Sequence, residues 1–179
     1  GAEPNSHRDP VCLGMPGVLP VLNHKAVELA MRMGLYTGGE IQRRSSFARK
    51  NYFYPDLPKG YQISMFEQPL IRGGQIQVEV DGGWKSIRFN RIHLEEDAGK
   101  LIHSEERPES LFDVNRCGVP LIEIVTEPDF ETVEEVSRFL DKLKEMLIFG
   151  GVSRGNMEEG NIRVDVNISI RPENQTALG

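Results

Sequence analysis

The residues best suited to chemistry are three consecutive carboxylates, Glu95, Glu96 and Asp97, which follow an apolar run from Ile87 to Leu94. Side chains alternate along a strand, so Glu95 and Asp97 are expected on one face and Glu96 on the other. Clustered carboxylates repel one another, and their oxygens are the natural ligands of Mg²⁺ or Ca²⁺. The pattern indicates a cation site, although a solvated acidic turn would contain the same residues.

A second candidate is Glu123, which lies inside the apolar run from Leu121 to Val125. Apolar residues on both faces of this run predict a strand that is buried on both sides. An ionised Glu123 there would cost several kcal/mol unless it were paired, protonated or bound to a metal. A salt bridge to Arg116 is the structural alternative. We expect a functional role, because this strand and the acidic turn both require a cation.

Two further segments carry charges that could contact a ligand. In residues 161–170, Arg163 and Asp165 share the polar face of an alternating pattern. That face could be solvent-exposed, or it could line a cleft in which Arg163 and Arg171 bind phosphate and Asp165 helps to hold a metal. In residues 43–59, basic residues are interleaved with Tyr and Phe, a pattern that suits phosphate and base binding. A loop whose aromatic side chains fill the core would look the same.

The composition is that of a folded globular domain, with 179 residues, 39% hydrophobic and 27% charged. Two cysteines argue against a disulfide framework, so a bacterial cytoplasm or an organelle matrix is the expected compartment. No apolar run approaches the roughly 20 residues that a membrane span requires, so no membrane partner is expected. The net charge of −6 argues against strong nucleic-acid binding by this segment alone.

The pattern of hydrophobic residues predicts an α+β fold, with a mostly antiparallel sheet and flanking helices. Residues 1–21 are expected to be irregular. The expected elements are a helix after Asn23, a hairpin of strands 75–80 and 84–94, a strand over 120–125, a helix from Thr132 to Gly150 and a strand over 161–170. A three-residue step from Phe89 to Ile92 predicts a bulge near Asn90 or Arg91.

The chemistry indicated is that of oxygen ligands. The sequence has no serine-nucleophile motif, no Walker loop and no dinucleotide fingerprint, and its four histidines show no metal-ligand spacing. Its carboxylates are spread over several predicted strands, with Arg and Lys nearby. Carboxylates that hold Mg²⁺, together with cations on the phosphates of ATP, are the groups that phosphoryl transfer requires.

Several segments resemble the B subunit of aspartyl/glutamyl-tRNA amidotransferase. They are residues 49–64, Arg91 to Lys100, residues 118–125, Glu127-Pro128-Asp129 and Met157 to Gly160. The resemblance implies a glutamine-synthetase-like catalytic cradle that phosphorylates the side-chain carboxylate of Glu on tRNA(Gln), or of Asp on tRNA(Asn), with ATP. Ammonia from a glutaminase A subunit would then replace the phosphate, and a small C subunit would brace the pair.

The resemblance also implies roles for individual residues. Glu96 and Glu123 would be Mg²⁺ ligands, and Asp165 and Glu159 would lie around the nucleotide and the acyl phosphate. Arg163, Arg171 and Lys100 would bind the nucleotide. Lys50, Lys59 and Glu96 would line the ammonia channel.

The chain also departs from that family. By this resemblance, residues 1–179 would correspond to part of a single cradle domain, without the family's opening Glu-x-His strand and without the helical and tail domains that carry much of the binding of mischarged tRNA. Asp9 and Cys12 stand where some relatives have Cys-Pro-Val-Cys, which argues against structural zinc. A non-catalytic module that docks the A subunit and shapes the ammonia channel is therefore the alternative to an enzyme.

Overall fold

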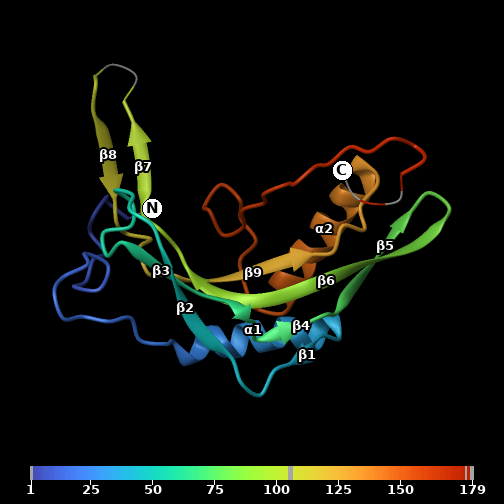
Figure 1. Ribbon diagram of the computed structural model, residues 1–179, viewed down its shortest axis with the longest axis horizontal. Helices are drawn as coiled ribbons and strands as arrows, with labels where there is room; N and C mark the ends of the chain where they lie inside the picture. Colours follow the sequence, from blue (N-terminus) through green and yellow to red (C-terminus); the bar gives the residue numbers. More distant parts are fainter. Residues whose placement is uncertain (1, 105–106, 176, 178–179) are drawn as a thin grey trace.

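The computed structural model describes residues 2–104, 107–175 and 177, and it has the α+β architecture that the sequence predicts (Figure 1). Residues 2–22 contain no helix or strand, as expected. The helices are α1 (His24–Thr37) and α2 (Val133–Phe149). The strands are β1 (Glu40–Ile41), β2 (Ser46–Asn51), β3 (Tyr61–Gln68), β4 (Ile71–Arg72), β5 (Gln75–Val80), β6 (Gly83–Glu96), β7 (Lys100–His103), β8 (Ser110–Asp113) and β9 (Pro120–Thr126).

The long strand β6 organises the sheet. It pairs antiparallel with β9 along one edge, with β3 and β4 along the other, and with β5 in a hairpin. The predicted bulge is confirmed by a register shift between Phe89 and Arg91 in the pairing with β9. Strands β7 and β8 form a separate two-stranded hairpin, which projects from the body of the molecule (Figure 1).

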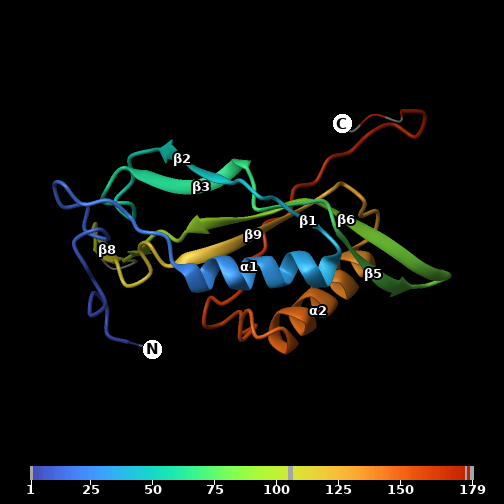
Figure 2. The same cartoon turned by 90° about the horizontal axis from the view of Figure 1, so that it is seen from below.

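The bulge gives β6 one apolar and one polar face. Ile87, Phe89, Ile92 and Leu94 are all buried in the core. Helices α1 and α2 pack on the apolar face, and Figure 2 shows them on the same side of β6 and β9. His93 and Glu95 alternate with the core residues and therefore lie on the face that the helices leave open.

Helix α1 begins after Asn23, as the sequence predicts. The side chain of Asn23 accepts a hydrogen bond from the backbone N–H of Lys25, and the helix ends at Gly38 with φ of 67°. At Gly34 a Cβ atom would come within 2.8 Å of the side chain of Ile71, so glycine allows the helix to approach the sheet closely.

Helix α2 is fixed at its start by a capping box, as the Thr132–Glu135 spacing predicts. The Glu135 carboxylate also accepts a hydrogen bond of 2.9 Å from Lys85 of β6, which ties the helix to the sheet. At its far end the helix stops at Gly150. Neither helix in the described residues is long and apolar enough to cross a membrane.

The prediction of a strand over residues 161–170 is wrong. This segment is extended but belongs to no sheet, and Val166, Ile168 and Ile170 are exposed rather than packed in the core. An alternating pattern shows that a segment can form a strand, but a strand also requires hydrogen bonding to the edge of another strand, and residues 161–170 make no such pairing. The β2–β3 and β7–β8 hairpins were not predicted from the sequence.

Replacing Ile92, which is fully buried, with alanine is expected to lower the free energy of unfolding by about 2–5 kcal/mol because it leaves a cavity. The matched control is Ile168→Ala in the exposed segment, with an expected change of less than about 0.5 kcal/mol. Urea unfolding followed by circular dichroism measures both. An equal decrease in the free energy of unfolding for Ile92→Ala and Ile168→Ala would show that Ile168 is packed in the core.

The Glu135–Lys85 contact predicts a pH-dependent contribution to stability. Hydrogen bonds from the backbone of Glu131, and then from the Lys85 side chain, lower the pKa of Glu135 below its ordinary range. A lowered folded-state pKa stabilises the fold above the unfolded pKa, and that stability is lost as the pH falls through the folded value.

Glu135→Gln retains the capping geometry but removes the charge. The stability difference between wild type and this variant is therefore expected to be largest near neutral pH and to shrink below about pH 4. Melting temperatures measured across this range test the expectation. A difference that does not change with pH would contradict it.

Candidate metal centre

Three side chains meet on the open face of the sheet and form what we call the metal cluster: His93 and Glu95 of β6 and Glu123 of β9. His93 and Glu95 are two residues apart on one strand, and His93 is directly opposite Glu123 in the antiparallel register. The Nε2 atom of His93 lies 2.9 Å from Oε2 of Glu123 and 3.2 Å from Oε1 of Glu95. One ligand atom from each residue lies within 4.8 Å of the other two, close enough to share a metal ion.

The imidazole and the two carboxylates of this cluster influence each other's charge. Burial of His93 opposes its charged form, but hydrogen bonds to Glu123 and Glu95 outweigh burial and raise the pKa of His93. Burial also acts on Glu95, yet hydrogen bonds from His93 and from the Ser64 hydroxyl lower the pKa of Glu95. The two carboxylates therefore require positive charge between them, and the imidazole supplies part of it.

The residues fit a divalent cation. Two carboxylates suit Mg²⁺, which commonly takes one or two protein carboxylates and keeps several waters. The imidazole is a better ligand for softer ions such as Mn²⁺ or Zn²⁺. The remaining ring nitrogen of His93, Nδ1, is buried and has no hydrogen-bond partner among the described residues.

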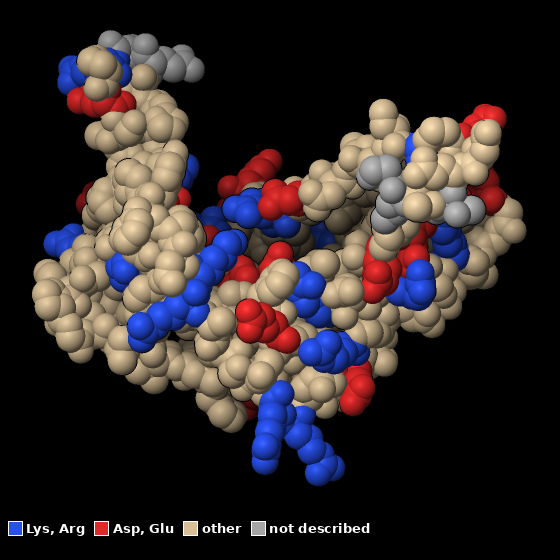
Figure 3. Space-filling view, viewed as in Figure 1, with Lys and Arg blue, Asp and Glu red and all other residues tan. Residues whose placement is uncertain are grey.

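The metal cluster opens into a large groove whose lining comes from β2, β3, β6 and β9, from both helices and from the C-terminal segment. Its charged lining includes Lys50, Glu95, Glu123, Glu159, Arg163 and Asp165. Figure 3 shows this side of the molecule hollowed between the β7–β8 hairpin and the C-terminal segment, with acidic and basic side chains gathered there. The positive charge of Lys50 contributes to lowering the pKa of Glu95. Carboxylates and a lysine thus share one open cavity.

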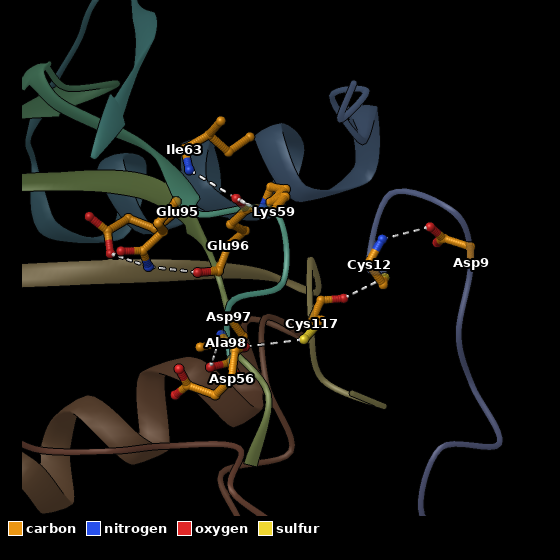
Figure 4. A network of polar contacts seen from close by, with 11 residues as sticks. Asp9, Cys12, Asp56, Lys59, Ile63, Glu95, Glu96, Asp97, Ala98 and Cys117 are labelled. Carbon is orange, nitrogen blue, oxygen red and sulfur yellow. Dashed lines mark hydrogen bonds and ion pairs between the residues drawn. The ribbon is translucent and has the colours of Figure 1, made fainter. Parts of the chain in front are cut away.

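Glu96 lies elsewhere. Its carboxylate accepts hydrogen bonds from the Lys59 ammonium and, at 2.9 Å, from the backbone N–H of Ile63. Figure 4 shows it pointing away from the Glu95 carboxylate, as alternation along β6 requires. Both members of the Lys59–Glu96 ion pair are largely buried, with 10% and 4% of their side chains exposed. The structure therefore unites Glu96 with Lys59, and it does not bring Glu96 together with Glu123.

Glu123 is less buried than the sequence predicts. Strand β9 is only partly buried, and 44% of the Glu123 side chain is exposed. Its ion-pair partner is His93 and not Arg116, which instead donates a 2.8 Å hydrogen bond to Asp97. The expectation of burial on both faces is wrong, because residues on both faces of β9 line the groove and are only partly buried.

The remaining predicted residues are dispersed. Arg163 contacts Asp165 at 3.1 Å, and Glu159 contacts Arg154 at 3.1 Å, all in the C-terminal segment that borders the groove. Lys100 begins β7, in register with Asp113. Lys100 and Arg171, which were predicted to bind the nucleotide, do not line the groove.

Sequence reasoning placed Glu95 in a possible cation site but did not include His93, whose Nε2 atom the structure brings close to both Glu95 and Glu123. The available signal was a His-x-Glu pattern at strand spacing, which places both side chains on one face. This pattern alone is weak evidence for a metal site, because two ligands on one strand indicate such a site only when a third ligand lies opposite them on the neighbouring strand.

The two cysteines do not form a metal site with other ligands in the described part of the chain. Cys12 Sγ donates to the carbonyl oxygen of Cys117 at 2.8 Å, as Figure 4 shows. Burial, as the main cause, raises the pKa of the Cys117 thiol to about 11. Within the described residues, the metal cluster is the one group of three or more possible ligands.

Comparison with known proteins identifies relatives along the whole chain. The family model described as "GatB/GatE catalytic domain" matches residues 1–179. The chain is 55% identical over 179 residues to the B subunit of the aspartyl/glutamyl-tRNA(Asn/Gln) amidotransferase of Desulfotalea psychrophila, covering 100% of this chain and 38% of that protein. The protein of the same name from Caldicellulosiruptor saccharolyticus is 58% identical, with 100% and 37% covered. The chain thus spans 37–38% of the length of these relatives.

The buried Lys59–Glu96 pair yields a stability prediction. Lys59→Met leaves the buried Glu96 carboxylate without its cation and is expected to cost about 3–5 kcal/mol. The double variant Lys59→Met/Glu96→Gln is expected to cost less than the sum of the two single changes, because no charge remains unpaired.

Chemical denaturation of the four proteins gives the coupling energy. The control is Lys142→Met, which breaks a surface pair with 52% and 61% of the side chains exposed and is expected to cost less than about 1 kcal/mol. Additive costs at Lys59 and Glu96 would contradict a buried, coupled ion pair.

Proposed function

Because the chain belongs to the GatB/GatE catalytic-domain family, we propose that it forms the phosphoryl-transfer core of a tRNA-dependent amidotransferase. The reaction would be the ATP-dependent amidation of Glu carried by tRNA(Gln), or of Asp carried by tRNA(Asn). The observation that carries this proposal is the meeting of His93, Glu95 and Glu123 in an open, charged groove.

The proposed reaction has two steps. An oxygen of the substrate's side-chain carboxylate attacks the terminal phosphorus of ATP, the bond from that phosphorus to the bridging oxygen breaks, and ADP leaves. Ammonia then attacks the carbon of the resulting acyl phosphate, the carbon–oxygen bond breaks, and inorganic phosphate leaves with the bonding electrons. The nitrogen loses a proton and the amide remains. Phosphorylation is needed because a carboxylate is a poor electrophile.

The groove residues would assist the first step. Glu95 and Glu123 would hold Mg²⁺, whose charge would offset the charge on the phosphates during transfer. His93, fixed between the two carboxylates, would orient them. Lys50 and Arg163 line the same groove and carry the positive charge that the phosphate oxygens require. Asp165 and Glu159 border it and would face the nucleotide or the acyl phosphate.

The Lys59–Glu96 pair suits the second step. It lies on the other side of β6 from Glu95, so the strand itself forms the wall between this polar site and the groove. We propose that ammonia reaches the groove past this pair, delivered by a glutaminase A subunit that is braced by a small C subunit. The buried charges would offer hydrogen bonds to a small polar molecule where the surrounding core offers none.

A non-catalytic role in assembly is the second candidate. It is favoured by the same Lys59–Glu96 pair, because a polar passage could serve a partner's chemistry without a nucleotide site nearby. The two candidates differ in one property: the catalytic core must bind Mg²⁺ and ATP, and the assembly module need not do so.

Mg²⁺ with ATP is expected to raise the melting temperature of the protein at its natural full length, because a ligand that binds only the folded state stabilises it. At a ligand concentration one hundred times Kd the gain is about 2.7 kcal/mol. Glu95→Gln and Glu123→Gln are expected to abolish the rise, since each removes a ligand charge. Differential scanning fluorimetry with and without Mg²⁺ measures the effect.

The matched control is Glu79→Gln on β5, a glutamate that does not line the groove and should leave the rise unchanged. Glu96→Gln should also retain most of the rise, because its carboxylate lies on the other side of the strand. An unchanged melting temperature in the wild type would favour the assembly role. If the rise were lost in Glu96→Gln but kept in Glu95→Gln and Glu123→Gln, Glu96 would be the metal ligand instead.

A further inference from the structure

Phe66 is an aromatic side chain in the groove whose role the proposed function leaves open. It lies on β3, lines the groove, and is 57% exposed. Its neighbour Met65 points the other way and is buried in the core. Since Ser64 pairs with Glu95 across β3 and β6, Phe66 shares the face of Ser64, beside the metal cluster.

The ring of Phe66 is held in place by two neighbours. The guanidinium carbon of Arg91 lies over the ring, 4.1 Å from its centroid. The imidazole of His93 meets Phe66 edge to face, with centroids 6.4 Å apart and an interplanar angle of 86°. These contacts fix the ring without enclosing it, and they connect it directly to a residue of the metal cluster.

Part of the ring remains accessible from the groove. Phe66 lines the groove and is 57% exposed, even with the Arg91 guanidinium over its ring. An exposed aromatic ring with a cation stacked against it forms a platform for a flat, aromatic ligand. Aromatic side chains that stack nucleobases are used in this way, and such stacking tolerates any base.

We propose that Phe66 stacks the adenine ring of an adenosine whose other end reaches the metal cluster. This inference rests on the proposed function, which supplies two adenosines: that of ATP and that at the 3′ end of the tRNA. In ATP the adenosine carries the phosphates, and at the 3′ end of the tRNA it carries the aminoacyl group with its side-chain carboxylate. Each of these charged groups must reach the metal cluster, while the base can remain on an apolar surface. Phe66 offers that surface next to the cluster.

The first test is nucleotide affinity, measured by isothermal titration calorimetry with Mg²⁺ on the protein at its natural full length. Phe66→Ala is expected to weaken ATP binding by about tenfold, because base stacking on an aromatic side chain contributes that order of affinity. Binding of tripolyphosphate, which lacks the adenosine, should not change. Phe66→Trp should restore the affinity for ATP.

The second test distinguishes the source of the adenosine. Two RNA acceptor-stem hairpins, one ending in adenosine and one lacking only that nucleotide, are titrated into the wild type and into Phe66→Ala. If the wild type binds the hairpin with the terminal adenosine more tightly than the shortened hairpin, and Phe66→Ala does not, Phe66 stacks the adenine of the RNA. A tenfold loss confined to ATP assigns the platform to the nucleotide.

The matched control is Phe53→Ala, since Phe53 is 93% exposed and does not line this groove. It should alter neither ligand's affinity. Unchanged affinities for both ATP and RNA in Phe66→Ala would overturn the inference while leaving the proposed function intact. So would an equal loss for ATP and tripolyphosphate, which would mean that Phe66 only supports the cluster. Wild-type protein that binds neither ATP nor tripolyphosphate would overturn the proposed function and this inference together.

Discussion

The register of β6 against β9 is the constraint on which the candidate site depends. His93 lies opposite Glu123 in that register, and a shift of one residue would turn Glu123 toward the helices and an isoleucine toward the groove. The bulge between Phe89 and Arg91 sets this phase. It lets both halves of β6 keep apolar side chains on the helix-covered face, and the second half then presents His93 and Glu95 to the groove.

The same alternation makes β6 a partition between two polar sites. Glu95 and Glu96 are adjacent in sequence, yet one belongs to the metal cluster and the other to a buried pair with Lys59. Strand β3 contributes to both sites, because Ser64 bonds Glu95 while the backbone of Ile63 bonds Glu96. This arrangement suits a reaction between a nucleotide-activated group and a small neutral molecule. The nucleotide would bind on one side of β6, and the small molecule would approach from the other side.

Much of the fold was predictable because its signals are local. The Asn23 cap, the Thr132–Glu135 capping box and the 75–94 hairpin are each specified by residues close in sequence. The segment 161–170 shows the limit of such signals. Its alternation is as regular as that of β5, but β5 is paired through a turn of its own, whereas 161–170 would need an edge from a distant part of the chain.

The metal cluster was harder to predict, because its members are defined by a pairing between distant segments. Glu123 was singled out from its apolar surroundings, but its partner His93 stands in an equally apolar run, where a histidine is most simply a core residue. Nothing within the run indicates that a carboxylate will lie 2.9 Å away on the next strand. The choice between Glu95 and Glu96 as the ligand has the same origin. The alternation of side chains along β6 places Glu95 and Glu96 on opposite faces of the strand. Which of the two faces the groove depends on where β9 and Lys59 lie in the folded protein.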